Sequence, residues 1–172
     1  MDVFSPRDLE YVIRLAEVVW GGALLAITIV IHGAGMLLTL TATNGLRSRF
    51  EKVRSRYPAV DLAIIILAAW MVVLVSLIEV VMWAEFFMWK SAQPSIFSAL
   101  YNGLLNYTTL QAGYLPTRWR LLEGMLGMAG LITFAWSTSV LFTLAQEFQD
   151  NALRLAKQRW EKNHTKPPSS VG

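Results

Sequence analysis

The sequence predicts an all-α membrane protein with three transmembrane helices and a shorter helix that enters the membrane without crossing it. Three apolar runs support the spans, at residues 18–44, 59–90 and 118–147. Each run is longer than the roughly 20 mostly apolar residues that a helix needs to cross a bilayer core. The composition agrees, because 55% of the 172 residues are hydrophobic, against roughly 45–50% in soluble domains.

The composition also excludes several kinds of site. There is no cysteine, which rules out disulfides, thiolate metal ligands and cysteine nucleophiles. The two histidines, His32 and His164, are far apart in sequence and show no metal-ligand spacing. The sequence contains no nucleophile–base–acid set and no phosphate-binding loop. We therefore expect no enzyme activity, no metal site and no cofactor.

Basic residues flank the apolar runs and predict the orientation of the chain. The loop 45–58 and the tail 148–172 are both rich in lysine and arginine. Such clusters mark the cytoplasmic side of a membrane protein. We therefore expect a multi-pass protein of the cytoplasmic (inner) membrane with its N-terminus outside and its C-terminus in the cytoplasm. No aromatic platform or groove motif accompanies these charges, so we expect membrane lipids as partners, no nucleic acid, and no soluble partner.

Local signals predict the helix boundaries. The acidic segment 1–17 differs from a signal peptide, which would be basic, and we expect an amphipathic lead into the first span. Asn44-Gly45 predicts the end of that first helix. Tryptophans near the outer end of the second span, such as Trp89, suit the membrane interface. We expect the third helix to continue beyond the membrane to about Trp160.

The uncharged segment 91–117 predicts a re-entrant half-helix. It carries seven polar side chains between Ser95 and Gln111 that a lipid-facing helix would leave without partners. Irregular backbone at membrane depth must be buried in protein or line a watery cavity. A helix from about Ser95 to Tyr107, followed by a turn back to the same surface, meets this requirement. A full crossing would place the basic tail outside, against the charge rule.

Small and hydroxylated residues predict what the third span contacts. Gly124, Gly127 and Gly130 leave one thin stripe where another helix can pack closely. Three hydroxyls follow further along the same helix and either line an inner cavity or bond their own backbone. These candidate cavity residues are Thr133, Ser137 and Thr138.

This order of elements resembles the pore module of the tetrameric potassium channel-like family, bacterial type. Residues 99–110, Ala-Leu-Tyr-Asn-Gly-Leu-Leu-Asn-Tyr-Thr-Thr-Leu, are similar to a pore helix that ends in Thr-Thr-Leu ahead of Gly-Tyr-Gly-Asp. Residues 116–124 and 134–138 resemble the return into the inner helix and part of that helix. The resemblance covers about residues 77–148 and implies a homotetramer around a central pore. The selectivity filter it implies comprises Thr108, Thr109, Leu110, Gln111, Ala112, Gly113 and Tyr114.

The filter departs from the family pattern after Leu110. Gln111 stands at the first glycine, Ala112 at the tyrosine, Gly113 at the second glycine and Tyr114 at the acidic position. A left-handed backbone costs a non-glycine residue about 1–2 kcal/mol, so we expect a loop of altered shape. We expect passive conduction of K⁺ or weakly selective monovalent cations, with K⁺ or Na⁺ as the permeant ions. The half-helix supports cations, because its C-terminal end carries about half a negative elementary charge.

Glu79, in the second span, has two candidate roles. Intramembrane carboxylates are costly and often functional. Glu79 either supports the half-helix through Asn102, Asn106 or Tyr107, or serves as a proton or cation site. Glu85 lies about 120° away around the helix, and we expect it at the membrane interface.

His32, in the first span, is not expected to pair with Glu79. It lies about 21 Å from the outer end of its span, whereas Glu79 lies within about 10 Å of that end at 1.5 Å per residue. We expect His32 to bond a neighbouring helix backbone, with pH sensing as the alternative. Near the start of the third span, Glu123 is expected to form a local ion pair with Arg118 or Arg120.

Two other functional classes stay open beside the channel. One is a non-conducting membrane scaffold or regulatory subunit that retains the pore-module fold. The other is a proton-coupled transporter that uses Glu79, against which the lack of a visible inverted repeat argues. The predicted segments are an extracytoplasmic N-terminus (1–17), a first span (18–44), a basic cytoplasmic loop (45–58), an outer-helix span (59–90), a pore helix and filter-like loop (91–117), an inner-helix span (118–147) and a basic cytoplasmic tail (148–172).

Overall fold

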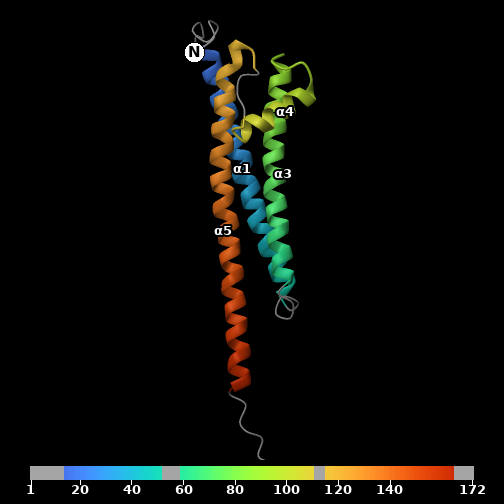
Figure 1. Ribbon diagram of the computed structural model, residues 1–172, viewed down its shortest axis with the longest axis vertical. Coiled ribbons are helices and arrows are strands. Elements are labelled where there is room, and N and C mark those ends of the chain that lie inside the picture. Colours follow the sequence, from blue (N-terminus) through green and yellow to red (C-terminus); the bar gives the residue numbers. More distant parts are fainter. Residues whose placement is uncertain (1–13, 52–58, 111–114, 165–172) are drawn as a thin grey trace, which may run out of the picture.

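The computed structural model describes residues 14–51, 59–110 and 115–164, and this part of the chain is helical with no strand. The predicted amphipathic start at 1–13, the middle of the basic loop at 52–58, the filter positions 111–114 and the tail 165–172 lie outside the described residues. The elements are α1 (Leu15–Arg49), α3 (Ala59–Trp89), α4 (Ile96–Tyr107), the short 3₁₀ helix η1 (Thr117–Trp119) and α5 (Arg120–His164) (Figure 1).

Three of these helices are long and apolar enough to cross a membrane. The helices α1, α3 and α5 contain 35, 31 and 45 residues. The helix α4 has 12 residues, about 18 Å at 1.5 Å per residue, which is too short to cross a core of about 30 Å. The fold therefore fits a multi-pass membrane protein with three spans and one short additional helix.

The helices α1 and α3 run antiparallel in one constant register. Thr28 faces Trp83, and His32, one turn further along α1, faces Glu79, one turn further back along α3. At one end of the pair the rings of Trp20 and Trp89 are in edge contact, with their ring centroids 5.4 Å apart. Trp119 also lies at this end, where its ring contacts that of Phe86. We call this end of the molecule the aromatic end below.

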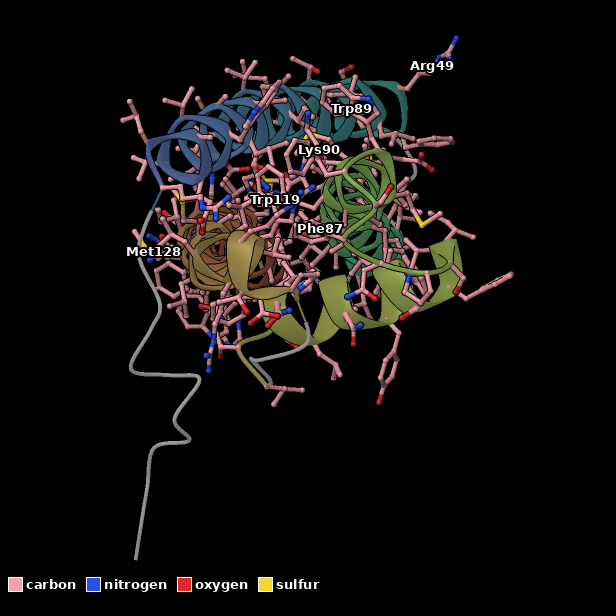
Figure 2. The ribbon with its side chains drawn as sticks, turned by 90° about the horizontal axis from the view of Figure 1, so that it is seen from above. Arg49, Phe87, Trp89, Lys90, Trp119 and Met128 are labelled. Carbon is pink, nitrogen blue, oxygen red and sulfur yellow. The ribbon has the colours of Figure 1, made fainter. Side chains whose placement is uncertain are left out.

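The short helix α4 lies on one side of the α3–α5 pair, and α1 lies on the other (Figure 2). Both α1 and α4 contact α3 and α5. Ser95 caps the start of α4, because its hydroxyl accepts the Ser98 backbone N–H at 3.2 Å. An N-cap serine satisfies one of the donors that a helix start leaves open, which agrees with the predicted start of the half-helix.

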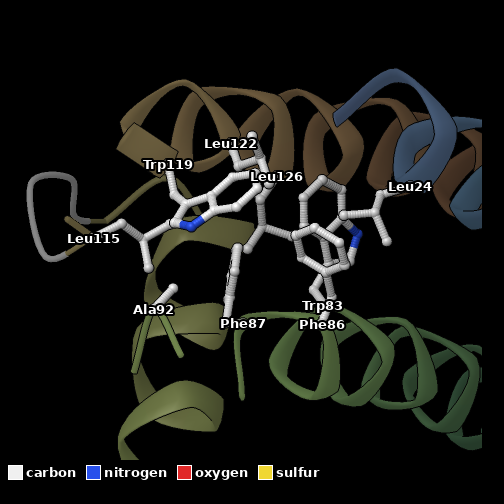
Figure 3. Packing of buried hydrophobic residues seen from close by; sticks show 9 residues of the cluster. All are labelled: Leu24, Trp83, Phe86, Phe87, Ala92, Leu115, Trp119, Leu122 and Leu126. Atoms are coloured by element: carbon white, nitrogen blue, oxygen red, sulfur yellow. The ribbon is translucent and has the colours of Figure 1, made fainter. Parts of the chain in front are cut away.

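A cluster of buried apolar side chains joins α1, α3 and α5 at the aromatic end (Figure 3). Ala92, just before α4, and Leu115, eight residues after it, both belong to this cluster. The chain therefore leaves the aromatic end before α4 and is back at that end when it reaches α5. The cluster comprises Leu24, Trp83, Phe86, Phe87, Ala92, Leu115, Trp119, Leu122 and Leu126.

At the opposite end two helices run further than expected. The prediction that α1 ends at Asn44-Gly45 is wrong, because the helix continues to Arg49. A glycine inside a helix costs only about 1 kcal/mol relative to alanine. The continued helix allows Arg47 to contact Glu147 and the Leu144 carbonyl on α5. The helix α5 runs on to His164, past the ends of the other helices (Figure 1).

Candidate functional site

The described part of the predicted filter begins directly after α4. The backbone N–H of Thr109 donates to the Asn106 carbonyl at 3.0 Å, and that of Leu110 donates to the Leu105 carbonyl at 2.8 Å. These two bonds define a Schellman motif, which normally places glycine in the left-handed position. Here Thr109 holds that position with a φ of 60°. A β-branched residue in this region is an outlier that its surroundings must hold in place.

The surroundings that hold the end of α4 are the glycines of α5. A Cβ added at Gly130 would overlap the Tyr107 carbonyl oxygen, and one at Gly127 would lie 3.4 Å from the Asn106 carbonyl oxygen. A Cβ at Gly124 would meet nothing within 4 Å. The glycine stripe therefore allows close backbone packing as predicted, but the partner is the end of α4 and the contact uses only two of the three glycines.

The centre of the candidate site is a buried hydrogen-bond network that joins all four helices. On α1, Nδ1 of His32 lies 2.8 Å from Oε1 of Glu79 on α3. The Tyr107 hydroxyl of α4 donates to the other oxygen, Oε2, at 2.5 Å. On α5, the Thr133 hydroxyl lies 2.6 Å from the Tyr107 hydroxyl, and the Ser137 hydroxyl lies 3.0 Å from Nε2 of His32. These five residues are called the four-helix network below.

The protons of this network can be assigned by counting donors. An ionised Glu79 only accepts, so His32 carries a proton on Nδ1 and Tyr107 gives its single proton to Oε2. The Thr133 hydroxyl has one proton for the Tyr107 oxygen and the Ala129 and Gly130 carbonyls of its own helix, and Ser76 also bonds the Tyr107 hydroxyl. A neutral imidazole accepts from Ser137 at Nε2. Every polar side-chain atom of the network thereby has a partner, as buried polar groups require.

Both ionisable groups at the centre are shielded completely. The exposed fractions of His32 and Glu79 are 0% each, and that of Thr133 is 1%. Tyr107 lies on α4, outside the three long helices, and its burial and its bond to Glu79 raise the pKa of the phenol to about 12. The phenol therefore keeps its proton near neutral pH and acts as the donor to the carboxylate.

The contact between His32 and Glu79 corrects the expectation that depth separates them. The contact of Trp20 with Trp89 sets the common level of α1 and α3. From that level His32 is 12 residues along α1 and Glu79 is 10 residues back along α3, about 18 Å and 15 Å at 1.5 Å per residue. The remaining difference of about 3 Å is within the reach of the side chains. The expected bond from His32 to a helix backbone is replaced by bonds to two side chains.

A second polar contact supports the pair one turn closer to the aromatic end. Nε1–H of Trp83 donates to the Thr28 hydroxyl at 2.9 Å, and this hydroxyl donates to the Leu24 carbonyl at 2.9 Å. Trp83 and Thr28 are both fully buried. This contact was not predicted, because tryptophan near a span end suits the lipid interface equally well. The α-helical spacing of Thr28 and His32, four residues apart, is the signal that indicates a shared buried face.

The other predicted site residues fall into different places. Ser137 and Thr138 border a cavity of about 360 Å³ between α3, α4 and α5. Thr133 lies inside the helix bundle and does not line this cavity. Asn106 is buried. Of the three partners proposed for Glu79, which are Asn102, Asn106 and Tyr107, the structure shows a bond to Tyr107.

Two acidic residues near the aromatic end behave differently. The side chain of Glu85 is exposed, as expected for an interfacial position. Glu123 is buried, and its carboxylate accepts the backbone N–H of Leu115 at 2.6 Å. Glu123 therefore holds the chain at Leu115, just before η1, a contact that the expected local ion pair does not include.

Comparison with known proteins gives no further assignment. No protein-family model matches the chain, and neither curated proteins nor solved structures match it. The chemistry of the site therefore rests on its geometry. That geometry provides a short helix with an exposed end and a buried acid–base pair behind it, and among the described residues it contains no group of three or more potential metal ligands.

Proposed function

We propose that the chain is the pore-forming subunit of a homotetrameric channel of the cytoplasmic membrane that conducts monovalent cations passively. The observation that carries the proposal is the path of the chain around α4. The chain leaves the aromatic end at Ala92, α4 ends against Gly130, and the chain is back at the same end at Leu115. Gly130 is ten residues into α5, about 15 Å along its axis. A segment that leaves one end of the bundle, ends its helix inside and comes back to the same end fits a re-entrant pore loop.

The exposed end of α4 supports assembly around an aqueous axis. Thr108, Thr109 and Leu110 are exposed and directly follow α4, which lies on the side of the bundle away from α1 (Figure 2). Backbone at membrane depth that faces lipid has no hydrogen-bond partners. Four copies that turn these ends toward one axis would surround them with protein and water, as channel pore loops require.

Charge supports cations as the conducted species. No charged residue occurs between residues 91 and 117, so within this segment the charge at the end of α4 comes from the helix terminus. The C-terminal end of α4 carries a partial negative charge of about half an elementary charge, and four ends add together at the axis. Carbonyl groups near Thr108 and Thr109 supply oxygen ligands of the kind that replace the water around K⁺.

The direct test is ion flux through the purified protein in liposomes. We expect passive K⁺ and Na⁺ flux that follows the concentration gradient and needs no pH gradient. The double substitution Gln111→Gly with Ala112→Tyr should raise the preference for K⁺ over Na⁺, because it restores the glycine and aromatic positions of a potassium filter. Both substituted positions lie outside the described helices. The variant can therefore be compared directly with the unchanged protein in the same flux assay.

Two results would contradict the channel. A folded protein that gives no flux for any monovalent cation would support the scaffold instead. Uphill flux driven by a pH gradient and lost in Glu79→Gln would support the proton-coupled transporter.

A further inference from the structure

The pair of His32 and Glu79 stands alone among the charges at its depth. On α1 no Asp, Glu, Lys or Arg occurs between Glu17 and Arg47, and on α5 none occurs between Glu123 and Glu147. The helix α4 carries no such residue. On α3 the nearest charged residues before and after Glu79 in the sequence are Asp61 and Glu85. The groups that bond the pair are therefore the Tyr107 and Ser137 hydroxyls, and Tyr107 is bonded in turn by the Thr133 and Ser76 hydroxyls.

The network can accept one proton without leaving any of its polar atoms unpaired. In the state with neutral His32, the Ser137 hydroxyl donates to Nε2. When a proton adds to Nε2, both ring nitrogens donate, and Ser137 turns to accept while its own proton goes to its helix backbone. The pair then has no net charge, which lowers the cost of burying the carboxylate inside a membrane.

A path to the pair exists from the cavity of about 360 Å³. Ser137 and Tyr107 both border this cavity, and they bond the two ends of the His32–Glu79 pair. A proton that reaches the Ser137 hydroxyl at the cavity wall is one hydrogen bond from Nε2 of His32. The cavity thus connects the buried pair to the side of the bundle on which α4 lies.

We propose that the His32–Glu79 pair binds a proton and that Tyr107 couples this binding to the position of the α4 end. The proposal rests on the proposed channel function and assigns a role to α1, which supplies His32. Tyr107 is the last helical residue of α4 and directly precedes Thr108. Its hydroxyl donates to the carboxylate whose charge the proton offsets. Proton binding therefore weakens the bond that holds the first filter residue in place, and conductance falls at acidic pH.

The structure contains a reporter of proton binding that does not depend on conduction. The ring centroid of Trp136 on α5 lies 5.7 Å from the ring centroid of His32. An imidazolium close to an indole quenches its fluorescence. We expect the fluorescence of the protein in lipid nanodiscs to fall on acidification. The pH-dependent part should disappear in Trp136→Phe and in His32→Gln. The exposed Glu85 provides the control Glu85→Gln, which should titrate like the unchanged protein.

Coupling is tested by recording conductance against pH in the same variants. The unchanged protein should lose conductance on acidification, and Glu79→Gln and His32→Gln should give a flat pH profile. Tyr107→Phe should also give a flat profile while its fluorescence still titrates, since the pair is intact but the link to α4 is gone. Tyr101→Phe, on the exposed face of the same helix, should keep both responses.

The results separate this proposal from the channel itself. Equal pH profiles of conductance in Glu79→Gln and the unchanged protein would overturn the coupling, with the channel function intact. An identical fluorescence titration in His32→Gln would overturn the proton-binding site. Fluorescence that titrates as expected in a protein without conductance would overturn the channel and the coupling, and would leave the proton-binding site standing.

Discussion

At the aromatic end of the molecule the helices meet through apolar side chains such as Trp83, Phe87 and Leu126, whereas at mid-depth they meet through the four-helix network. The aromatic cluster is buried and so is the network except for the half-buried Tyr107, but the two regions hold the helices by different means. Lipid tails are as apolar as leucine, so burial of apolar area gives little drive between helices within a membrane. Close packing and directional hydrogen bonds remain, and these are concentrated where α4 ends.

The difference has a consequence for function. A contact made by many apolar atoms tolerates small shifts and exchanges of similar volume. A buried hydrogen-bond network has few arrangements that satisfy all of its polar atoms, and its members set one another's positions. The end of α4 is fixed by Tyr107 on one side and by Gly130 on the other. The position of Thr108 and Thr109 therefore depends on the mid-depth contacts more than on the aromatic cluster.

Removal of the central carboxylate is expected to have the largest effect. Glu79→Leu keeps a similar volume but leaves His32 and Tyr107 without their acceptor. Breaking a buried pair on one side costs about 3–5 kcal/mol, and we expect a loss of this order in the free energy of unfolding in detergent. Glu85→Leu, at an exposed position of the same helix, should change it by less than about 0.5 kcal/mol. Equal losses in the two variants would show that the network carries no special share of the stability.

Next in size is a steric change at the end of α4. Gly130→Ala places a methyl group on the Tyr107 carbonyl oxygen, a backbone atom that cannot rotate away. Overpacking of this kind costs about 1–3 kcal/mol and should displace Thr108. Gly124→Ala, which meets nothing within 4 Å, should be neutral or stabilise α5 by up to about 1 kcal/mol through helix propensity. Thermal unfolding of the two variants measures the difference, and the same midpoint for both would contradict the close contact.

The smallest effect is expected from the contact beside the pair. Thr28→Val removes the acceptor of the Trp83 indole N–H but keeps the side-chain shape. Hydrogen bonds between membrane helices average about 0.6 kcal/mol, and we expect a loss of that size. Thr138→Val is a suitable control, because the Thr138 hydroxyl bonds the Phe134 carbonyl of its own helix. A loss of several kcal/mol in Thr28→Val would place the main helix contact beside Trp83 and not at Glu79.

Much of the fold follows from the sequence, because membrane thickness sets the length of each span. The three long helices and the 12-residue helix after Ser95 occur where hydropathy and polarity predict them. The register between helices was not predictable in the same way. It depends on which tryptophans share a level, and the sequence offers several near each span end. The error in the His32 depth came from this choice, and the contact of Trp20 with Trp89 resolves it.

The end of α4 was beyond prediction for a different reason. A helix that ends in a Schellman motif normally shows glycine at the left-handed position, and here that position is Thr109. The end of α3 has the same form, with Ser91 at a φ of 50°. Both ends are held by contacts distant in sequence, which local signals do not contain. The filter positions 111–114, on which the departure from the potassium channel pattern rests, lie outside the described residues.

The central claim is that four copies of this chain bring their α4 ends together around one aqueous axis. Electron microscopy of the purified protein in lipid nanodiscs tests it most directly. We expect a fourfold ring in which Thr108 and Thr109 of each copy face the axis and α1 lies on the outside. A monomer, a dimer, or a ring whose axis is filled by lipid would contradict the claim.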